Sequence, residues 1–193
     1  VTDLTTFDKS LTVDGGAGFD VIHTNKTVAT LADGESLTFD AEQIQLTLSD
    51  ITVGGYGYVT IAGTGGSGTS NNDGVATNSG SSITAQAGNI EITGTAGGTG
   101  GQNRGVNIAG TTLTTTGGNI LLEGTGSGTG SSNTGVFTAT ATLTTAGLGN
   151  ITIQGTAGTG GLNTTYNQGV RLATTTATTA DGVIDIEGTG NAT

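Results

Sequence analysis

Short runs of alternating apolar and polar residues recur along most of the chain. Ile90 and Ile92 stand one residue apart directly before a Gly-Thr pair, and Val106 and Ile108 follow an Asn-x-Gly turn. A third run centres on a single apolar residue, for example Leu113. Successive side chains of a strand point to opposite faces, so this alternation is typical of strands with one buried face. The pattern predicts three short strands, repeated several times.

Two sequence markers show the length of the repeat. Both recur every 30 to 34 residues, and a unit of that length with three short strands cannot bury its apolar face alone. Coiled once per repeat, each strand pairs in parallel with its equivalent in the next coil. The sequence therefore predicts an all-β fold, a right-handed parallel β-helix (solenoid) with three strands per coil of about 30 residues. The Gly-Thr pairs begin at Gly63, Gly94, Gly124, Gly155 and Gly188, and the Asn-x-Gly-Val turns begin at Asn72, Asn103, Asn133 and Asn167.

The first part of the chain departs from this period. Residues 1–53 hold most of the acidic side chains and have strand-like runs at irregular spacing. We interpret them as irregular, shorter coils or a cap on the same axis, because an open end of a β-helix exposes unpaired strand edges. Residues 54–193 are then the regular repeats. Since the last residues begin a further repeat, we expect the chain to be a piece of a longer protein.

Asparagines occupy two positions of every regular repeat. Asn adopts the left-handed backbone region of turns more easily than most residues, and stacked Asn side chains can form hydrogen bonds from one coil to the next. We therefore predict two structural ladders. One ladder holds Asn72, Asn103, Asn133 and Asn167, and the other holds Asn89, Asn119 and Asn150.

The third strand of the repeat has a Thr-x-Thr pattern with the central residue facing inward. Its outward hydroxyls form two files along the predicted sheet, which resemble the flat ice-binding face of β-helical antifreeze proteins. This resemblance implies a face for ice or carbohydrate, whereas the alternative is that Thr is simply a good strand former. The residues are Ser82, Thr84, Thr112, Thr114, Thr142, Thr144, Thr176 and Thr178.

Charge and composition narrow the possible partners. The formal net charge is −11 with four basic residues, so the basic surface that nucleic acid requires is missing from the sequence. Cysteine is absent, which excludes disulfides and thiolate metal sites. No apolar run reaches the length of a membrane span, and we expect no insertion into a membrane.

One stretch suggests a metal ion. Residues 15–23, GGAGFDVIH, resemble the glycine-rich nonapeptide that binds Ca²⁺ in RTX repeats. That resemblance implies calcium ligands at Asp14 and Asp20, and we expect no other cofactor. A full calcium site needs neighbouring repeats of the same motif, so a tight glycine turn before a strand is the alternative interpretation.

The sequence offers no convincing catalytic group. Glu91 and Asp185 share an outward file but lie three coils apart, and Glu123 and Glu187 lie two coils apart. The paired carboxylates of glycoside hydrolysis must converge within several ångströms. His23 is the single histidine. We expect no enzymatic activity, and a polysaccharide-cleaving β-helix enzyme is the least favoured alternative.

The repeated pattern GNIxIxGT…NxGV…LT resembles the repeats of filamentous-haemagglutinin-like adhesins of bacteria. The resemblance covers residues 54–193, although the secretion domain of that family is not part of this sequence. It implies a non-catalytic shaft, structural or adhesive, of a large surface protein or filament. It also implies secretion by a bacterium to the cell surface. The expected partners are further repeats or other copies stacked head-to-tail, and surface carbohydrate.

Overall fold

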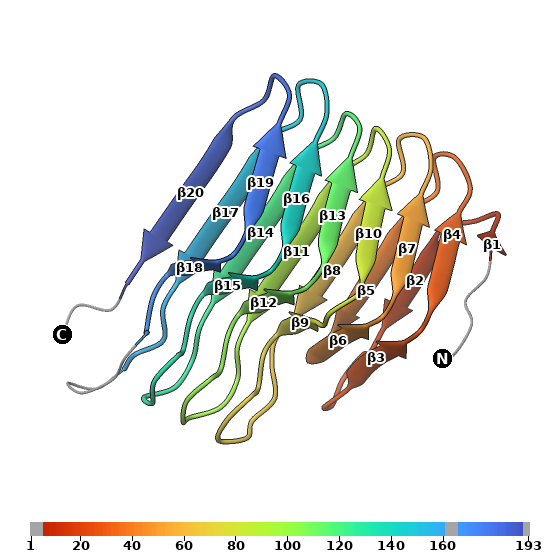
Figure 1. Ribbon diagram of the computed structural model, residues 1–193. Helices are drawn as coiled ribbons and strands as arrows, with labels where there is room; N and C mark the ends of the chain where they lie inside the picture. Colours follow the sequence, from red (N-terminus) through yellow and green to blue (C-terminus); the bar gives the residue numbers. More distant parts are fainter. Residues whose placement is uncertain (1–5, 161–165, 191–193) are drawn as a thin grey trace.

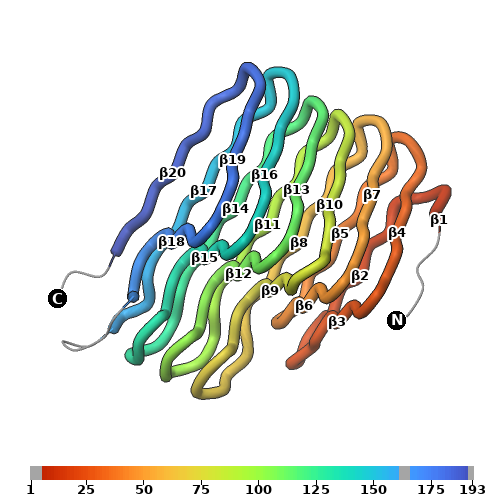
Figure 2. The backbone as a smooth tube through the Cα atoms, in the orientation of Figure 1, coloured from red at the N-terminus to blue at the C-terminus, as the bar shows by residue number. Residues whose placement is uncertain are grey.

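The chain winds into a coil of short strands. The computed structural model describes residues 6–160 and 166–190. Figures 1 and 2 show the coils side by side, with β1 at one end and β20 at the other. The described residues form strands, turns and loops but no helix, so none that could span a membrane is present among them. The predicted all-β class is confirmed.

Three parallel sheets run along the coil, and each turn of the chain adds one strand to each of them. The first sheet contains β1 (Thr6–Phe7), β4 (Val28–Leu31), β7 (Asp50–Val53), β10 (Ser82–Ala85), β13 (Thr112–Thr115), β16 (Thr142–Thr145) and β19 (Thr176–Thr179). The second contains β2 (Leu11–Asp14), β5 (Leu37–Ala41), β8 (Val59–Gly63), β11 (Ile90–Thr95), β14 (Ile120–Thr125), β17 (Ile151–Thr156) and β20 (Ile184–Thr189). The third contains β3 (Val21–Asn25), β6 (Gln43–Thr47), β9 (Val75–Thr77), β12 (Val106–Ala109), β15 (Val136–Ala139) and β18 (Val170–Ala173).

The core is a set of columns of aliphatic side chains inside the coil. Ile92 pairs with Leu122 and Leu122 with Ile153, and all three are fully buried. Each column exists because the repeat places an apolar residue at the same point of every coil. At the end of the coil, the inward-facing Ile184 and Ile186 of β20 remain 40% and 44% exposed. The interior stack predicted from the repeat is confirmed.

The first coils are shorter but use the same three sheets. Leu11 pairs with Leu37, and Leu37 pairs with Val59, so the strands of the acidic section continue the register of the regular repeats. The difference in length lies at one corner. In this section, β5 and β6 are joined through Glu42 alone, whereas a long loop joins β8 to β9 in the next coil.

Loops protrude from the corner between the second and third sheets, at the lower left of Figure 1. We call residues 64–74, 96–105 and 126–135 the protruding loops. Glycines hold the two ends of each loop together: a Cβ on Gly94 would lie 2.1 Å from the carbonyl oxygen of Gly105. The Gly-Thr and Asn-x-Gly markers of the repeat therefore meet in space. Successive loops also stack, since the N–H of Thr129 donates to the carbonyl of Thr99 at 2.9 Å.

Candidate functional site

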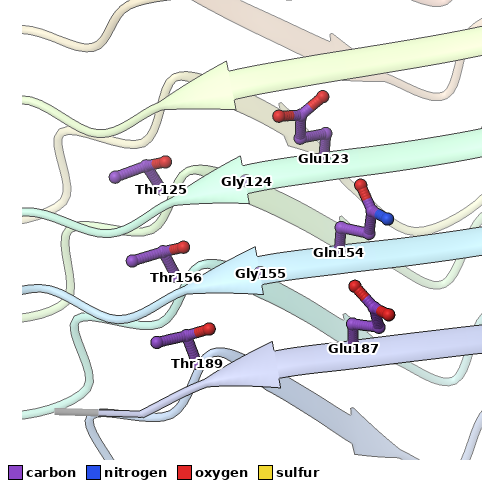
Figure 3. Close-up of a pocket in the computed structure, with 8 residues that line it drawn as sticks. All are labelled: Glu123, Gly124, Thr125, Gln154, Gly155, Thr156, Glu187 and Thr189. Carbon is purple, nitrogen blue, oxygen red and sulfur yellow. The ribbon is translucent and has the colours of Figure 1, made fainter.

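Shallow hollows lie on the outer face of the second sheet in the described part of the chain, and the strand register sets which side chains surround them. Figure 3 shows one hollow, of about 220 Å³, between two files of side chains. Gly124 and Gly155 form the floor of this hollow. One wall consists of Glu123, Gln154 and Glu187, and the other of Thr125, Thr156 and Thr189.

The two glutamates of this hollow have a simple geometry. Glu123 and Glu187 are separated by two strand spacings, about 9.6 Å between backbones, with Gln154 between them. Both glutamates are exposed, whereas a catalytic acid of this class normally occupies an apolar environment that raises its pKa. Glu91 and Asp185 are further apart, as the repeat predicts. The arrangement presents solvated acids beside hydroxyl groups.

Two further hollows follow one another along the same face. Tyr56, Tyr58, Asn89 and Glu91 line a hollow of about 280 Å³. A neighbouring hollow of about 300 Å³ shares Asn89 and Glu91 with the first and extends to Asn150. We call the two together the axial groove, because they cross successive strands along the axis of the coil. Tyr56 and Tyr58 are 85% and 50% exposed, so their rings are accessible at one end of this groove.

Asn89, Asn119 and Asn150 form the exposed ladder beside the axial groove. The backbone N–H of Asn119 donates to Oδ1 of Asn89, and that of Asn150 donates to Oδ1 of Asn119, both at 2.8 Å. Oδ1 of Asn150 accepts the N–H of Val183 at 2.7 Å. Each side chain thus reaches toward the following coil. Because backbone N–H groups only donate, these contacts also fix which end of each amide is the oxygen.

Asn72, Asn103, Asn133 and Asn167 form the second ladder, at the base of the protruding loops. The N–H of Asn72 donates to Oδ1 of Asn103, and the N–H of Asn103 donates to Oδ1 of Asn133, both at 3.0 Å. The Asn133 N–H donates to Oδ1 of Asn167 at 2.8 Å. These side chains reach toward the preceding coil, opposite to the exposed ladder.

The two middle asparagines of the second ladder are also buried and fully used. Asn103 and Asn133 have no exposed surface. The Nδ2 group of Asn103 donates to the carbonyl of Thr69, and that of Asn133 donates to the carbonyl of Gly100. These two amides therefore join their own coils to the protruding loop of the coil before. Because backbone groups occupy both ends of the two amides, Asn103 and Asn133 have a structural role.

Serines continue the exposed ladder into the short coils. The repeat pattern of the sequence did not predict this continuation. The N–H of Ser36 donates to Oγ of Ser10, and the N–H of Tyr58 donates to Oγ of Ser36. Ser10 also donates to Glu35 at 2.7 Å, and this hydrogen bond lowers the pKa of the Glu35 carboxyl. Tyr58 occupies the next position of the ladder, where a short polar side chain would otherwise stand. The signal in the sequence is weak because the short coils have no common period.

The outward Thr files lie on the first sheet, and one file is longer than the Thr-x-Thr pattern predicts. The predicted residues pair in register, for example Thr114 with Thr144 and Thr112 with Thr142. Thr84 also pairs with Thr52, in the acidic section. One position of all seven strands of this sheet is therefore threonine: Thr6, Thr30, Thr52, Thr84, Thr114, Thr144 and Thr178. The neighbouring file holds Val28 and Asp50 before Ser82, Thr112, Thr142 and Thr176.

The glycine-rich stretch at residues 15–23 contains the turn between β2 and β3 and the first residues of β3. Oδ1 of Asp14 accepts the N–H of Gly16 at 2.8 Å, and Glu42 accepts the N–H of Asp20 at 2.9 Å. The Asp14 carboxylate thus acts within the turn, whereas at Asp20 the backbone N–H makes the contact, to a carboxylate of the next coil. Across the described residues, no group of three or more His, Cys, Asp or Glu side chains is placed to hold a metal ion. Calcium binding at Asp14 and Asp20 stays a prediction.

The two arginines gather at the corner beside the third sheet. The guanidinium of Arg104 lies 4.6 Å from the centre of the Phe137 ring, and that of Arg171 lies 5.2 Å from it. Arg171 also lies 4.5 Å from the centre of the Tyr166 ring. Phe137 pairs in register with Arg171 of the next coil, so the cluster links successive coils by cation–π contacts. His23 is exposed on β3, away from this cluster.

Asp73 lies nearby and is 8% exposed. Its carboxylate accepts the backbone N–H of Arg104 and Nδ2 of Asn107, both at 2.8 Å. Burial raises the pKa of Asp73 above its usual value, and these hydrogen bonds and the Arg104 charge offset part of that effect. Nothing in the alternating pattern separated this buried acid from the exposed ones.

The chain was compared with models of protein families, with curated proteins and with solved structures, and none of them matches it.

Proposed function

We propose that this chain is a rigid, non-catalytic shaft of a large bacterial surface protein or filament, structural or adhesive in role. The observation that carries the proposal is the unbroken register of the three sheets. Every full coil adds one strand to each sheet, so length grows by about 4.8 Å per coil while the three-sheet core is kept. The first sheet alone extends about 29 Å over its seven strands. Such a fold suits a spacer.

The resemblance to filamentous-haemagglutinin-like repeats supports the same role, with secretion to the bacterial cell surface. Further repeats or another copy stacked head-to-tail are the proposed partners. Ile184 and Ile186 present an apolar end against which such a coil would pack. Calcium at the glycine-rich turn is a proposed addition to the shaft, not a requirement of it.

Imaging of the native material is the direct test. We expect fibres or stalks in the native material, and small-angle X-ray scattering of this chain should give a short rod, about 29 Å along its axis and wider at the protruding loops. Globular native particles without stalks would contradict the proposal. The non-catalytic part has its own test: no reducing ends should be released from a panel of polysaccharides, with or without Ca²⁺. Release of reducing ends would make the chain an enzyme.

A second candidate function is binding of ice through the first sheet. The unbroken file of seven threonines favours it, because a flat periodic array of hydroxyl and methyl groups can match an ordered layer of water. Inhibition of ice recrystallisation by the chain, lost when Thr114 and Thr144 are both changed to Lys, would support it. A chain without such activity would exclude this candidate and leave the shaft unaffected.

A further inference from the structure

We infer that the axial groove on the second sheet binds a neutral, linear polysaccharide. This inference adds a ligand to the proposed shaft but does not depend on it. The groove has a pair of accessible aromatic rings, a row of amides, and a wall whose side-chain oxygens can accept hydrogen bonds. Each of these features fits a sugar chain.

The first feature is a row of unused hydrogen-bond donors. The exposed ladder consumes the Oδ1 atoms of Asn89, Asn119 and Asn150 as acceptors of backbone N–H groups. Within the described residues, Nδ2 of Asn89 and of Asn150 has no acceptor, and Nδ2 of Asn119 has only a long contact of 3.4 Å to Asn89. The ladder thus turns its amino groups toward solvent at a spacing of one strand, about 4.8 Å.

This spacing suits a polymer that runs along the axis. A pyranose unit in an extended chain advances by a length similar to one strand spacing, so successive units can meet successive amides. The hydroxyl oxygens of the sugars accept from the Nδ2 groups. On the other wall, the Glu91 carboxylate and the Thr152 hydroxyl accept hydrogen bonds from sugar hydroxyls.

The second feature is the aromatic end of the groove. Tyr56 and Tyr58 leave 85% and 50% of their surfaces exposed, and both line the hollow that contains Asn89 and Glu91. The flat apolar face of a sugar ring packs against an aromatic ring, while the phenol hydroxyl stays available to polar groups. Tyr58 also interrupts the ladder, so the position that carries a short polar side chain elsewhere carries a ring here.

The negative charge of the groove and of the whole chain favours neutral polymers over acidic ones. Among the described residues, Glu91 is the one charged side chain that lines the axial groove, and the whole chain has a net charge of −11. Carboxylated or sulfated polysaccharides and nucleic acids would be repelled. An extended peptide is disfavoured for another reason: β8, β11, β14 and β17 already pair with one another, so the groove has no free strand edge to offer.

Native gel electrophoresis with a soluble polysaccharide in the gel tests the inference. The neutral, linear probes are mixed-linkage β-glucan and pullulan, and the acidic probes are polygalacturonate and alginate. We expect at least one neutral polymer to slow the chain and neither acidic polymer to do so. Changing both tyrosines, Tyr56→Ala with Tyr58→Ala, should weaken binding at least tenfold.

Asn119→Asp provides a second variant that keeps the fold. The new carboxylate still accepts the N–H of Asn150 but has no amino group, so binding should weaken several-fold. Asn25→Asp makes the same change of charge at an exposed site on β3, and Phe19→Ala removes an exposed ring elsewhere. Both controls should bind like the unchanged chain, and circular dichroism should show strands in all variants.

Three results would overturn the inference: no retardation by any neutral polymer, unchanged binding by the double tyrosine variant, or equal retardation by the acidic polymers. None of them bears on the rod measured by X-ray scattering. A failure of the groove is therefore distinguishable from a failure of the shaft.

Discussion

Gly94 and Gly105 face each other so closely that a Cβ on the first would lie 2.1 Å from the carbonyl oxygen of the second. The same approach recurs between Gly124 and Gly135, also at 2.1 Å. Two glycines at a distance of about ten residues in the sequence thus close the base of each protruding loop. The strongest features of the repeat are explained by backbone packing at this corner.

Gly94→Ala should lower the free energy of unfolding by about 1–3 kcal/mol or more, because the methyl group has no space unless the backbone moves. Urea denaturation of the variant measures this cost. The matched control is Gly117→Ala, where the nearest atom to a new Cβ lies 3.6 Å away. Equal stability of the two variants would contradict the packing at this corner.

The two ladders should differ in their contribution to stability. Asn103→Ala leaves the N–H of Asn72 and the carbonyl of Thr69 without their buried partner, so we expect a loss of about 2–4 kcal/mol. Asn119→Ala removes an exposed contact that water can replace, and the loss should be about 1 kcal/mol or less. Urea denaturation compares the two variants, and hydrogen exchange should be faster at the Asn72 amide in Asn103→Ala. A larger loss from Asn119→Ala would show that the assignment of the buried ladder is wrong.

Asp73 should give stability a dependence on pH. Burial raises its pKa in the folded state, so the folded chain holds the proton to higher pH than the unfolded chain does. The contribution of this group to stability is therefore greatest below its ordinary pKa of 3.8 and declines as the pH rises through the raised value. Asp73→Asn cannot ionise and should lack this decline.

Denaturation of both proteins from about pH 4 to 7 measures this effect. The stability of Asp73→Asn relative to the unchanged chain should increase with pH. The comparison cancels the opposite contribution of Glu35, whose lowered pKa favours the folded state at higher pH. Parallel curves for the two proteins would exclude the proposed role of Asp73.

Phe137 and Arg171 should show a favourable coupling. A double-mutant cycle with Phe137→Leu and Arg171→Gln should give about 0.5–1 kcal/mol, the usual strength of an exposed cation–π contact. Salt should weaken this coupling less than it weakens an ion pair on the surface. Independent effects of the two changes would mean that the contact contributes nothing to stability.

Much of this fold was predictable because each inward position repeats. Ile92, Leu122 and Ile153 share a place in the repeat and a column in the core, so the period was enough to place them. Thr30 and Ser36 were harder to place, because the short coils omit the protruding loop: Thr30 lies 22 residues before its partner Thr52, and Ser36 lies 22 residues before Tyr58, outside the period of the regular repeats. The packing of the core decides which side chains of these coils face outward, and the identity of a single residue does not show that packing.

The candidate site was predicted less well than the fold. Asn89, Asn119 and Asn150 were expected to stack, but the atom that each amide leaves unused depends on the direction in which the side chain leans. Asp73 resembles any other acid in the sequence, and only the fold of its loop buries it. Tyr56 and Tyr58 did not stand out, because their importance depends on the hollow that they share with the next coil.

The two asparagine ladders lean in opposite directions along the axis, so a regular coil forms amide hydrogen bonds with the coil before it and with the coil after it. Any whole turn presents the same pair of complementary edges above and below. A duplicated or deleted segment of one full turn would therefore find matching neighbours without any other substitution. The axial length of the protein is set by its number of coils. Duplication or deletion of a coil in the gene can therefore change that length without further substitutions.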